Sequence, residues 1–126
     1  MHATGIVQRM VRRNEFLSLV LDLMAPLGAI SSRAMFGGHG LYCNGLFIAL
    51  VANDKLYFKA DTQSQPRFES AGLQRFRYTA RGKTVQLMYY EAPAEVYENS
   101  QAMAGWGQFA LAAAVRARRP ARKKLD

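Results

Sequence analysis

His39 and Cys43 are the residue types that most often build a nucleophilic or metal-binding site, and they lie four positions apart. A thiolate nucleophile needs a neighbouring base and usually a third, orienting group, and zinc needs three or four nitrogen, sulfur or oxygen ligands. The only other histidine is His2, near the start of the chain. We therefore expect Cys43 to be a small core side chain. We predict no catalytic residues, no metal site and no cofactor, and an enzyme built on this pair remains the third of three hypotheses.

The glycine-rich segment Gly37-Gly38-His39-Gly40 has the composition of a phosphate-binding loop. Such a loop needs backbone N–H groups that open onto the N-terminus of a helix. Here the glycines lead instead into Leu41-Tyr42-Cys43 and an Asn-Gly turn, and their spacing fits neither a dinucleotide-binding nor a Walker A motif. We expect a bulge or strand crossing that requires positive φ or close backbone approach.

Tyrosines and a basic end are the features that would suit nucleic acid. Aromatic rings on a sheet can stack on single-stranded bases, and basic side chains neutralise phosphates. The C-terminal cluster consists of Arg116, Arg118, Arg119, Arg122, Lys123 and Lys124. Two interpretations of this cluster stay open, a nucleic-acid contact or a solubilising terminal tail.

The net charge of +8 comes from the two ends of the chain. Residues 14–115 hold eight basic and eight acidic side chains and are therefore neutral. The excess comes from Arg9, Arg12 and Arg13 at one end and from the C-terminal cluster at the other. Net charge therefore gives no support for a basic groove across the domain.

The sequence carries no plausible signal peptide or membrane-spanning helix. The uncharged segment 34–53 has the length of a membrane span, but its four glycines and Asn44 make it a poor helix. One cysteine excludes a disulfide framework. With 126 residues, half of them hydrophobic, the chain is long enough for one domain with its own core. We expect a cytoplasmic protein.

Helical and strand periodicities alternate in an orderly way along the chain. Asn14 is a suitable N-cap for a helix whose apolar stripe runs from Phe16 to Leu27. The stripe is wide, so that either a second subunit or the rest of the chain must cover it. Four or five strands follow, with hairpins predicted at Asn44-Gly45 and Arg81-Gly82. The segment 46–52 is apolar throughout and should be a central strand.

Two helical segments complete the pattern. A short helix is expected over residues 65–72, and a last helix runs from a cap at Ser100 to about Arg118. Gly105 and Gly107 flank Trp106, so that either this helix packs closely against another backbone or it begins only after Trp106. We predict an α+β fold, an antiparallel sheet of five to six strands with the N- and C-terminal helices packed on it as a two-layer sandwich.

The run Arg33-Ala34-Met35-Phe36-Gly37-Gly38-His39-Gly40-Leu41-Tyr42 resembles the N-terminal domain of the TfoX/Sxy family of competence regulators. The resemblance continues through the segments 45–50, 56–61 and 88–93 and covers about residues 14 to 115. It divides the chain into a basic arm (1–13), the TfoX-like domain (14–115) and a basic tail (116–126). Ten ordered motif positions make it far more specific than any site considered above.

The resemblance implies a compact α/β domain, often self-associating, with no known active site. Full-length family members regulate natural competence genes together with the cAMP receptor protein, and they add a second, helical domain that this chain does not show. No catalytic residues are carried over. The residues we assign to the signature, as structural or partner-binding positions, are Arg33, Met35, Phe36, Gly37, Gly38, Gly40, Lys59, Tyr89 and Tyr90.

Three hypotheses follow from these observations. The first is a non-enzymatic regulatory or protein-interaction module, a homodimer with a protein partner in transcription regulation. It would touch nucleic acid only through its basic ends and would not bind membranes. The second is a small nucleic-acid binder that uses the basic tail and surface tyrosines. The third is the enzyme centred on His39 and Cys43.

Overall fold

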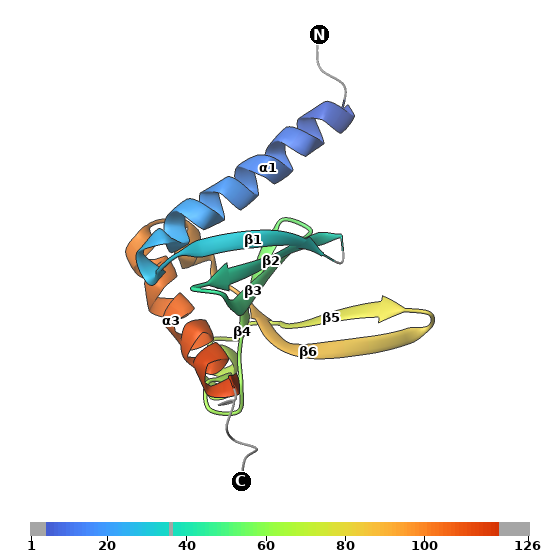
Figure 1. Cartoon of the computed structure of the whole chain (residues 1–126). Coiled ribbons are helices and arrows are strands. Elements are labelled where there is room, and N and C mark those ends of the chain that lie inside the picture. Colours follow the sequence, from blue (N-terminus) through green and yellow to red (C-terminus); the bar gives the residue numbers. More distant parts are fainter. Residues whose placement is uncertain (1–4, 36, 119–126) are drawn as a thin grey trace.

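A six-stranded antiparallel sheet with its helices gathered on one face forms the body of the protein (Figure 1). The structure, a computed structural model, describes residues 5–35 and 37–118. In chain order the elements are α1 (Gly5–Met24), the 3-10 turn η1 (Ala25–Leu27), β1 (Ile30–Met35), β2 (Gly38–Cys43), β3 (Leu46–Ala52), β4 (Lys55–Lys59), α2 (Gln65–Ser70), β5 (Arg75–Ala80), β6 (Lys83–Glu91), the 3-10 turn η2 (Ala94–Tyr97) and α3 (Ser100–Ala117). The predicted α+β class is confirmed.

Two tight turns of the sheet were readable from the sequence. Asn44 and Gly45 have φ values of 52° and 83°, and Arg81 and Gly82 have φ values of 53° and 79°. Two consecutive positive φ angles are the mark of the type I′ turn that matches the twist of a two-stranded ribbon. Both predicted hairpins are therefore confirmed.

The first helix begins earlier than its predicted cap. Helix α1 starts at Gly5, and Asn14 lies within it, so the N-cap prediction was wrong. The segment before Asn14 contains no proline and is rich in glutamine, methionine and arginine, which are good helix formers. Nothing in the local sequence therefore stops the helix at Asn14.

The cap of the last helix lies one residue before the predicted one. Asn99 caps α3, with its side-chain oxygen accepting a hydrogen bond of 2.8 Å from the Ala102 N–H. Ser100 is the first helical residue, and Trp106 lies inside the helix, so a start after Trp106 is excluded. Close packing explains one of the two glycines, because a methyl group on Gly107 would lie 2.7 Å from Cδ1 of Leu27.

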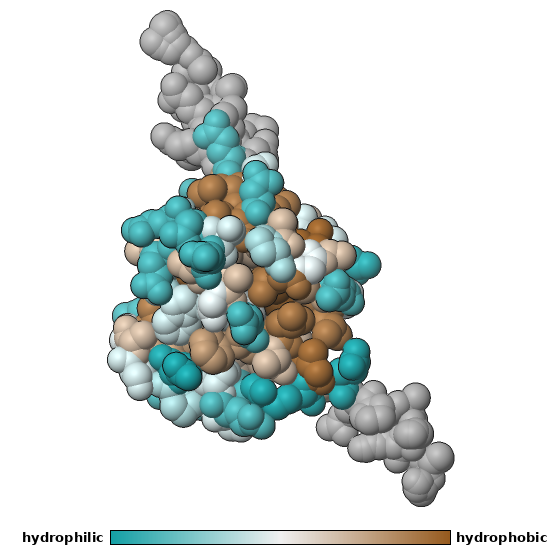
Figure 2. Space-filling model, turned by 90° about the vertical axis from the view of Figure 1, so that its left-hand side faces the viewer, coloured by the Kyte–Doolittle hydropathy of each residue, from teal (hydrophilic) through white to brown (hydrophobic). Residues whose placement is uncertain are grey.

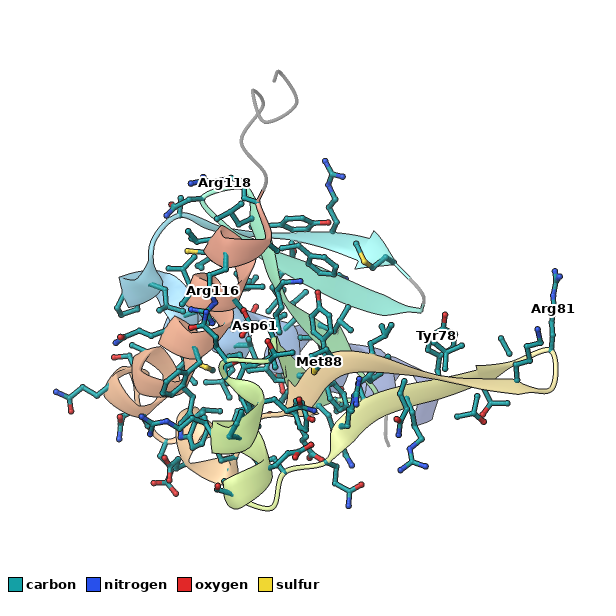
Figure 3. All side chains as sticks on the ribbon, turned by 90° about the horizontal axis from the view of Figure 1, so that it is seen from below. Asp61, Tyr78, Arg81, Met88, Arg116 and Arg118 are labelled. Atoms are coloured by element: carbon teal, nitrogen blue, oxygen red, sulfur yellow. The ribbon has the colours of Figure 1, made fainter. Side chains whose placement is uncertain are left out.

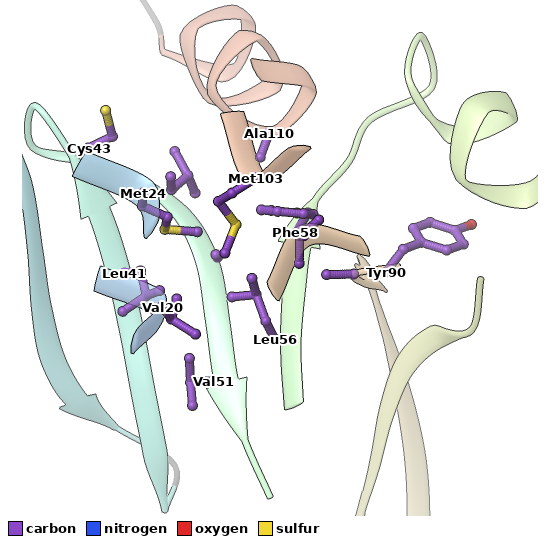
Figure 4. Packing of buried hydrophobic residues seen from close by; sticks show 14 of the residues in the cluster. Val20, Met24, Leu41, Cys43, Val51, Leu56, Phe58, Tyr90, Met103 and Ala110 are labelled. Carbon is purple, nitrogen blue, oxygen red and sulfur yellow. The ribbon is translucent and has the colours of Figure 1, made fainter. Parts of the chain in front are cut away.

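The core lies between the sheet and the helices (Figure 4). Val20 and Met24 of α1 and Met103 of α3 are fully buried against Leu41 of β2 and neighbouring strand residues. The chain itself therefore covers most of the wide apolar stripe of α1. Seen from the helix side, some hydrophobic surface remains between hydrophilic patches (Figure 2). Leu19 is 42% exposed there.

The strand order β1-β2-β3-β4-β6-β5 places the second hairpin outside the first four strands. Strand β6 pairs with β4 only at the body end, through Tyr57–Glu91, Phe58–Tyr90 and Lys59–Tyr89. Beyond Tyr89, β6 pairs only with β5. The β5–β6 hairpin therefore extends away from the body as a two-stranded ribbon (Figure 1).

A bidentate ion pair holds the end of α3 to the loop after β4. Nε and Nη2 of Arg116 donate to the two carboxylate oxygens of Asp61 at 2.7 and 2.9 Å (Figure 3). The hydrogen bonds from Arg116, together with those from the backbone N–H groups of Ser64 and Gln63, lower the pKa of Asp61 to about 2. No helix in the described ranges 5–35 and 37–118 is long and apolar enough to cross a membrane.

Gly105 and Gly107 make a matched pair for a stability test. A methyl group on Gly105 meets no atom within 4 Å, so Gly105→Ala should raise the free energy of unfolding by about 1 kcal/mol through helix propensity alone. Gly107→Ala has the same propensity gain but must displace the Leu27 side chain, so its net gain should be smaller. Urea unfolding of both variants checks the difference, and equal stabilisation would contradict the packing argument.

The Asp61–Arg116 pair predicts a specific acid dependence. Because the folded-state pKa of Asp61 lies below its unfolded value of about 3.9, the pair stabilises the fold above that pH, and the stabilisation is lost as pH falls through about 2. Arg116→Gln should therefore unfold at lower urea than the wild type near neutral pH, and the difference should close between about pH 4 and about pH 2. Arg118→Gln is the control, and a pH-independent difference for Arg116→Gln would contradict the assignment.

Candidate functional site

One face of the sheet carries no helix from the described part of the chain. All the helices of that part pack on the opposite face, where the core lies. We call the helix-free side the uncovered face. Lys55 and Glu91 form an ion pair on it, and its other principal side chains are apolar, aromatic or basic. They are Arg33, Met35, Tyr42, Phe47, Leu50, Tyr57, Lys59, Phe76, Tyr78, Val85, Leu87 and Tyr89.

Three aromatic rings in contact with one another cross the middle of the uncovered face. Tyr42 and Phe47 have ring centroids 5.1 Å apart, and Phe47 lies 5.8 Å from Tyr89. Tyr89 is only 8% exposed, and this burial raises the pKa of its hydroxyl to about 12. Tyr89 therefore stays protonated and neutral near neutral pH. Rings at these separations stabilise one another, so this surface is ordered without a covering layer.

Two cations flank the aromatic row. The Arg33 guanidinium carbon lies 5.7 Å from the centre of the Tyr42 ring, and Nζ of Lys59 lies 5.4 Å from the centre of the Tyr89 ring. Within residues 5–35 and 37–118, neither cation has a carboxylate partner in an ion pair. Cation–π contacts hold these side chains over the rings while their charges stay available to an incoming carboxylate.

Gly40 lets these groups meet on one surface. A methyl group there would lie 2.7 Å from Cε of Met35 and 2.9 Å from Cε1 of Phe47. A β-bulge follows directly, between Leu41 and Tyr42. The close approach expected in the glycine segment is therefore confirmed, whereas the bulge lies just beyond that segment. Gly38 has the same restriction against the backbone carbonyl of Val51, and Gly37 has a φ of 77°.

A pocket of about 250 Å³ opens at one end of the uncovered face. It lies where the start of β2, the end of β3 and the β5–β6 hairpin come together. Its apolar side chains include Met35, Leu50, Phe76 and Leu87, and His39 and Tyr78 are the residues in its lining with polar side chains. A predominantly apolar pocket with few polar groups accepts apolar side chains of a partner better than a charged ligand.

The structure brings five of the predicted signature residues to the uncovered face. They are Arg33, Met35, Gly40, Lys59 and Tyr89. Tyr90 lies on the core side, where its hydroxyl donates to Glu69 at 2.7 Å and accepts from Gln65 at 2.8 Å. Its ring stacks on Phe68. Tyr90 is therefore a structural residue, and Phe36 lies outside the described residues.

His39 and Cys43 do not form a pair. They are four residues apart on one strand, a separation of roughly 13 Å. Cys43 is fully buried with Sγ 3.5 Å from the carbonyl oxygen of Leu27, and burial raises the pKa of its thiol. Cys43 is thus the core side chain that we expected. Within residues 5–35 and 37–118 no group of three or more His, Cys, Asp or Glu side chains is arranged to hold a metal ion.

The predicted nucleic-acid contacts at the C-terminus are only partly within the described chain. Arg116 is engaged by Asp61, and Arg118 is exposed. Arg119, Arg122, Lys123 and Lys124 lie outside the described residues. The arginines of the basic N-terminal arm, Arg9, Arg12 and Arg13, fall within α1.

The family model described as the TfoX N-terminal domain matches residues 22–114. The chain belongs to this family. The match begins within α1 and ends within α3, so it contains the whole sheet and the uncovered face. The resemblance inferred from the run at Arg33–Tyr42 is confirmed.

Two curated proteins are similar to this TfoX-type chain. It is 28% identical over 105 residues to the DNA transformation protein TfoX1 of Aliivibrio fischeri, an alignment that covers 81% of this chain and 50% of the relative. It is 26% identical over 95 residues to the protein Sxy of Escherichia coli, which covers 75% of this chain and 46% of the relative. The chain therefore spans about half the length of each of these two relatives.

Two features of the site were missed by the sequence reasoning. The segment 46–52 is the central strand that the sequence predicted, but the pattern did not show that Phe47 and Leu50 lie on the helix-free side of the sheet. The uneven charge of the second hairpin was hidden in the neutral sum over residues 14–115. The sequence did carry a signal for this uneven charge, because no acidic residue occurs between Glu69 and Glu91.

Proposed function

We propose that this chain is a non-enzymatic regulatory module that acts in DNA-transformation competence, through transcription regulation, by binding a protein partner on its uncovered face. The family membership and the relative described as a DNA transformation protein support the process. The observation that carries the mode of action is the convergence of Arg33, Met35, Gly40, Lys59 and Tyr89 on one helix-free surface.

The chemistry of the uncovered face defines the kind of partner. Its centre is aromatic and apolar, and the pocket at its end accepts apolar side chains. Arg33 and Lys59 stand at opposite sides of the aromatic row and favour carboxylates. The best match is a partner segment that presents apolar side chains between acidic ones. Such a surface has an aromatic core with a charged rim, as protein interfaces commonly do.

A transformation assay in the source organism tests this function. Deletion of the gene should lower the recovery of transformants with a marked DNA at least tenfold, and the wild-type chain expressed in trans should restore it. The double variant Arg33→Glu/Lys59→Glu should fail to restore it, because it reverses both flanking charges. An unchanged transformation frequency after deletion would overturn the proposed process.

A matched control separates the uncovered face from net charge. Arg67→Glu/Arg118→Glu makes the same change in total charge at two exposed positions that lie off the uncovered face, on α2 and at the end of α3. This control variant should restore transformation as the wild type does. Equal failure of both double variants at equal protein levels would contradict a specific role for the uncovered face.

We further propose that the chain is a cytoplasmic homodimer in which α1 contributes to the interface. Leu19 is a large apolar side chain of α1 that is 42% exposed, and a second copy would cover it. Sedimentation velocity should give a dimer for the wild type and a monomer for Leu19→Glu. A monomeric wild type at tens of micromolar would overturn the dimer.

Nucleic-acid binding through the basic tail and surface tyrosines is the second candidate function. Arg118 is exposed, and Tyr78 is the most exposed of the tyrosines on the uncovered face, at 43%. Because Arg116 is engaged with Asp61, the candidates for phosphate contact in the tail are the basic residues that follow Arg116. Truncation to residues 1–118 therefore removes four basic side chains and keeps the ion pair. DNA-binding measurements on this truncation distinguish binding by the tail from binding by the rest of the chain.

A further inference from the structure

The β5–β6 hairpin concentrates positive charge in a domain whose total charge is close to zero. Between Glu69 and Glu91 the chain contains Arg75, Arg77, Arg81 and Lys83 and no acidic residue. Among the described residues the ion pairs are Lys55–Glu91 and Asp61–Arg116, so none of these four cations is neutralised there. The acidic side chains that balance their charge lie elsewhere on the domain.

The hairpin is also the most exposed element of the fold. Every residue from Arg77 to Gln86 is exposed, and the ribbon stands clear of the helices and of the other strands (Figures 1 and 3). Arg75 braces its base, because its Nε donates to the Leu87 carbonyl oxygen at 3.0 Å. The ribbon therefore presents both of its faces and its tip to the surroundings.

The two faces of the ribbon differ in chemistry. Phe76, Tyr78, Val85 and Leu87 belong to the uncovered face. Because side chains alternate along a strand, Arg77, Thr79, Thr84 and Gln86 lie on the opposite, polar face. The register pairs Arg77 with Gln86 and Thr79 with Thr84, whose hydroxyl oxygens are 3.0 Å apart. The polar face is thus a block of four side chains that form hydrogen bonds.

The turn at the tip carries a residue that the backbone geometry does not favour. The described non-glycine residues with positive φ are Asn44, Asn53, Asp54 and Arg81. Asparagine and aspartate tolerate this region, whereas arginine does not gain the same local hydrogen bonds. Arg81 therefore occupies a strained position at the point farthest from the body (Figure 3). Strain of this kind points to a functional use of the side chain.

We propose that the β5–β6 ribbon inserts into the major groove of duplex DNA. In this arrangement the polar face bearing Arg77 and Gln86 meets the base edges, and Arg81 and Lys83 contact phosphates. Major grooves admit two-stranded ribbons, and arginine and glutamine are residues that pair with guanine and adenine edges. From Arg77 to Arg81 the strand spans roughly 13 Å, close to the groove width of about 12 Å, so that the tip reaches a phosphate wall while the polar face lies over the bases.

Other nucleic acids fit the ribbon less well. The major groove of duplex RNA is deep and too narrow for side chains to read. Single-stranded bases would stack on aromatic rings, but Tyr78 and Phe76 lie on the opposite face from Arg77 and Gln86. The apolar face of the ribbon also continues into the surface that we assign to a protein partner. The DNA inference does not depend on that partner assignment.

Fluorescence anisotropy with a labelled random-sequence duplex tests the proposal on the full chain across a salt series. Arg81→Gln/Lys83→Gln should weaken binding and reduce the slope of log affinity against log salt by about 2, since each phosphate contact contributes about 0.9. Arg77→Ala/Gln86→Ala should weaken binding severalfold with a slope change of about 1 or less. Methyl green, which occupies the major groove, should compete with the wild type, whereas the minor-groove ligand netropsin should not.

Arg33→Gln/Arg67→Gln is the matched control, because it removes the same charge from exposed positions outside the ribbon that form no ion pair among the described residues. It should retain the wild-type slope, and circular dichroism should show that all variants are folded. The proposal is overturned if the wild type does not bind duplex DNA at low salt, or if Arg81→Gln/Lys83→Gln binds with the same salt slope as the control. It is also overturned if truncation to 1–118 abolishes binding that the ribbon variants retain. Preference for single-stranded DNA that Tyr78→Ala removes would also overturn it. None of these outcomes bears on the transformation assay of the uncovered face.

Discussion

The arrangement of the whole domain depends on how closely α3 approaches the centre of the sheet. Helix α3 contacts β3 and β4, and its buried residues other than Met103 are glycine and alanine. Small side chains at Gly107 and Ala110 allow the helix to lie close to the strands, while Met103 fills the remaining space. Because Leu27 occupies the position beside Gly107, the same contact also locates η1 and the end of α1. One close helix contact thereby aligns both helices on one face of the sheet.

The other face of the sheet is left open because the two long helices both pack on the same side. Two long helices can cover the central strands on one side, and within the described chain they leave the second side without a layer. An antiparallel sheet tolerates one open face when the side chains on it are polar. Here they are instead aromatic rings stacked under two cations, a composition that folding alone does not require. Most of the described signature residues lie on this face, whereas the signature residue Tyr90 points to the core.

Sequence reasoning succeeded where structure is local and failed where it is not. The turns at Asn44-Gly45 and Arg81-Gly82 were readable because positive φ at two successive residues has few sequence solutions. The pairing of β6 with β4 was not readable, because α2 and β5 lie between them in the chain and no short-range pattern encodes their register. The start of α1 was predicted too late because Asn14 looked like a cap, although no local feature ends the helix before it. The uncovered face depends on that non-local pairing and on the bulge after Leu41. The sequence therefore shows its residues as a motif but does not show that their side chains share one surface.

The non-local pairing also explains how one domain can serve two macromolecules. Strand β6 leaves the body at Tyr89, so the same ribbon carries the apolar edge of the uncovered face on one side and the Arg77–Gln86 polar face on the other. A protein that covers Tyr78 and Val85 would bury apolar area and restrict the motion of the ribbon while leaving its polar face free. A restricted ribbon loses less conformational entropy when it enters a groove. Partner and DNA would then strengthen each other's binding, and linkage requires that strengthening to be equal in both directions. Regulation of this kind needs no catalysis, because the effect would lie in the coupling between two faces of one hairpin.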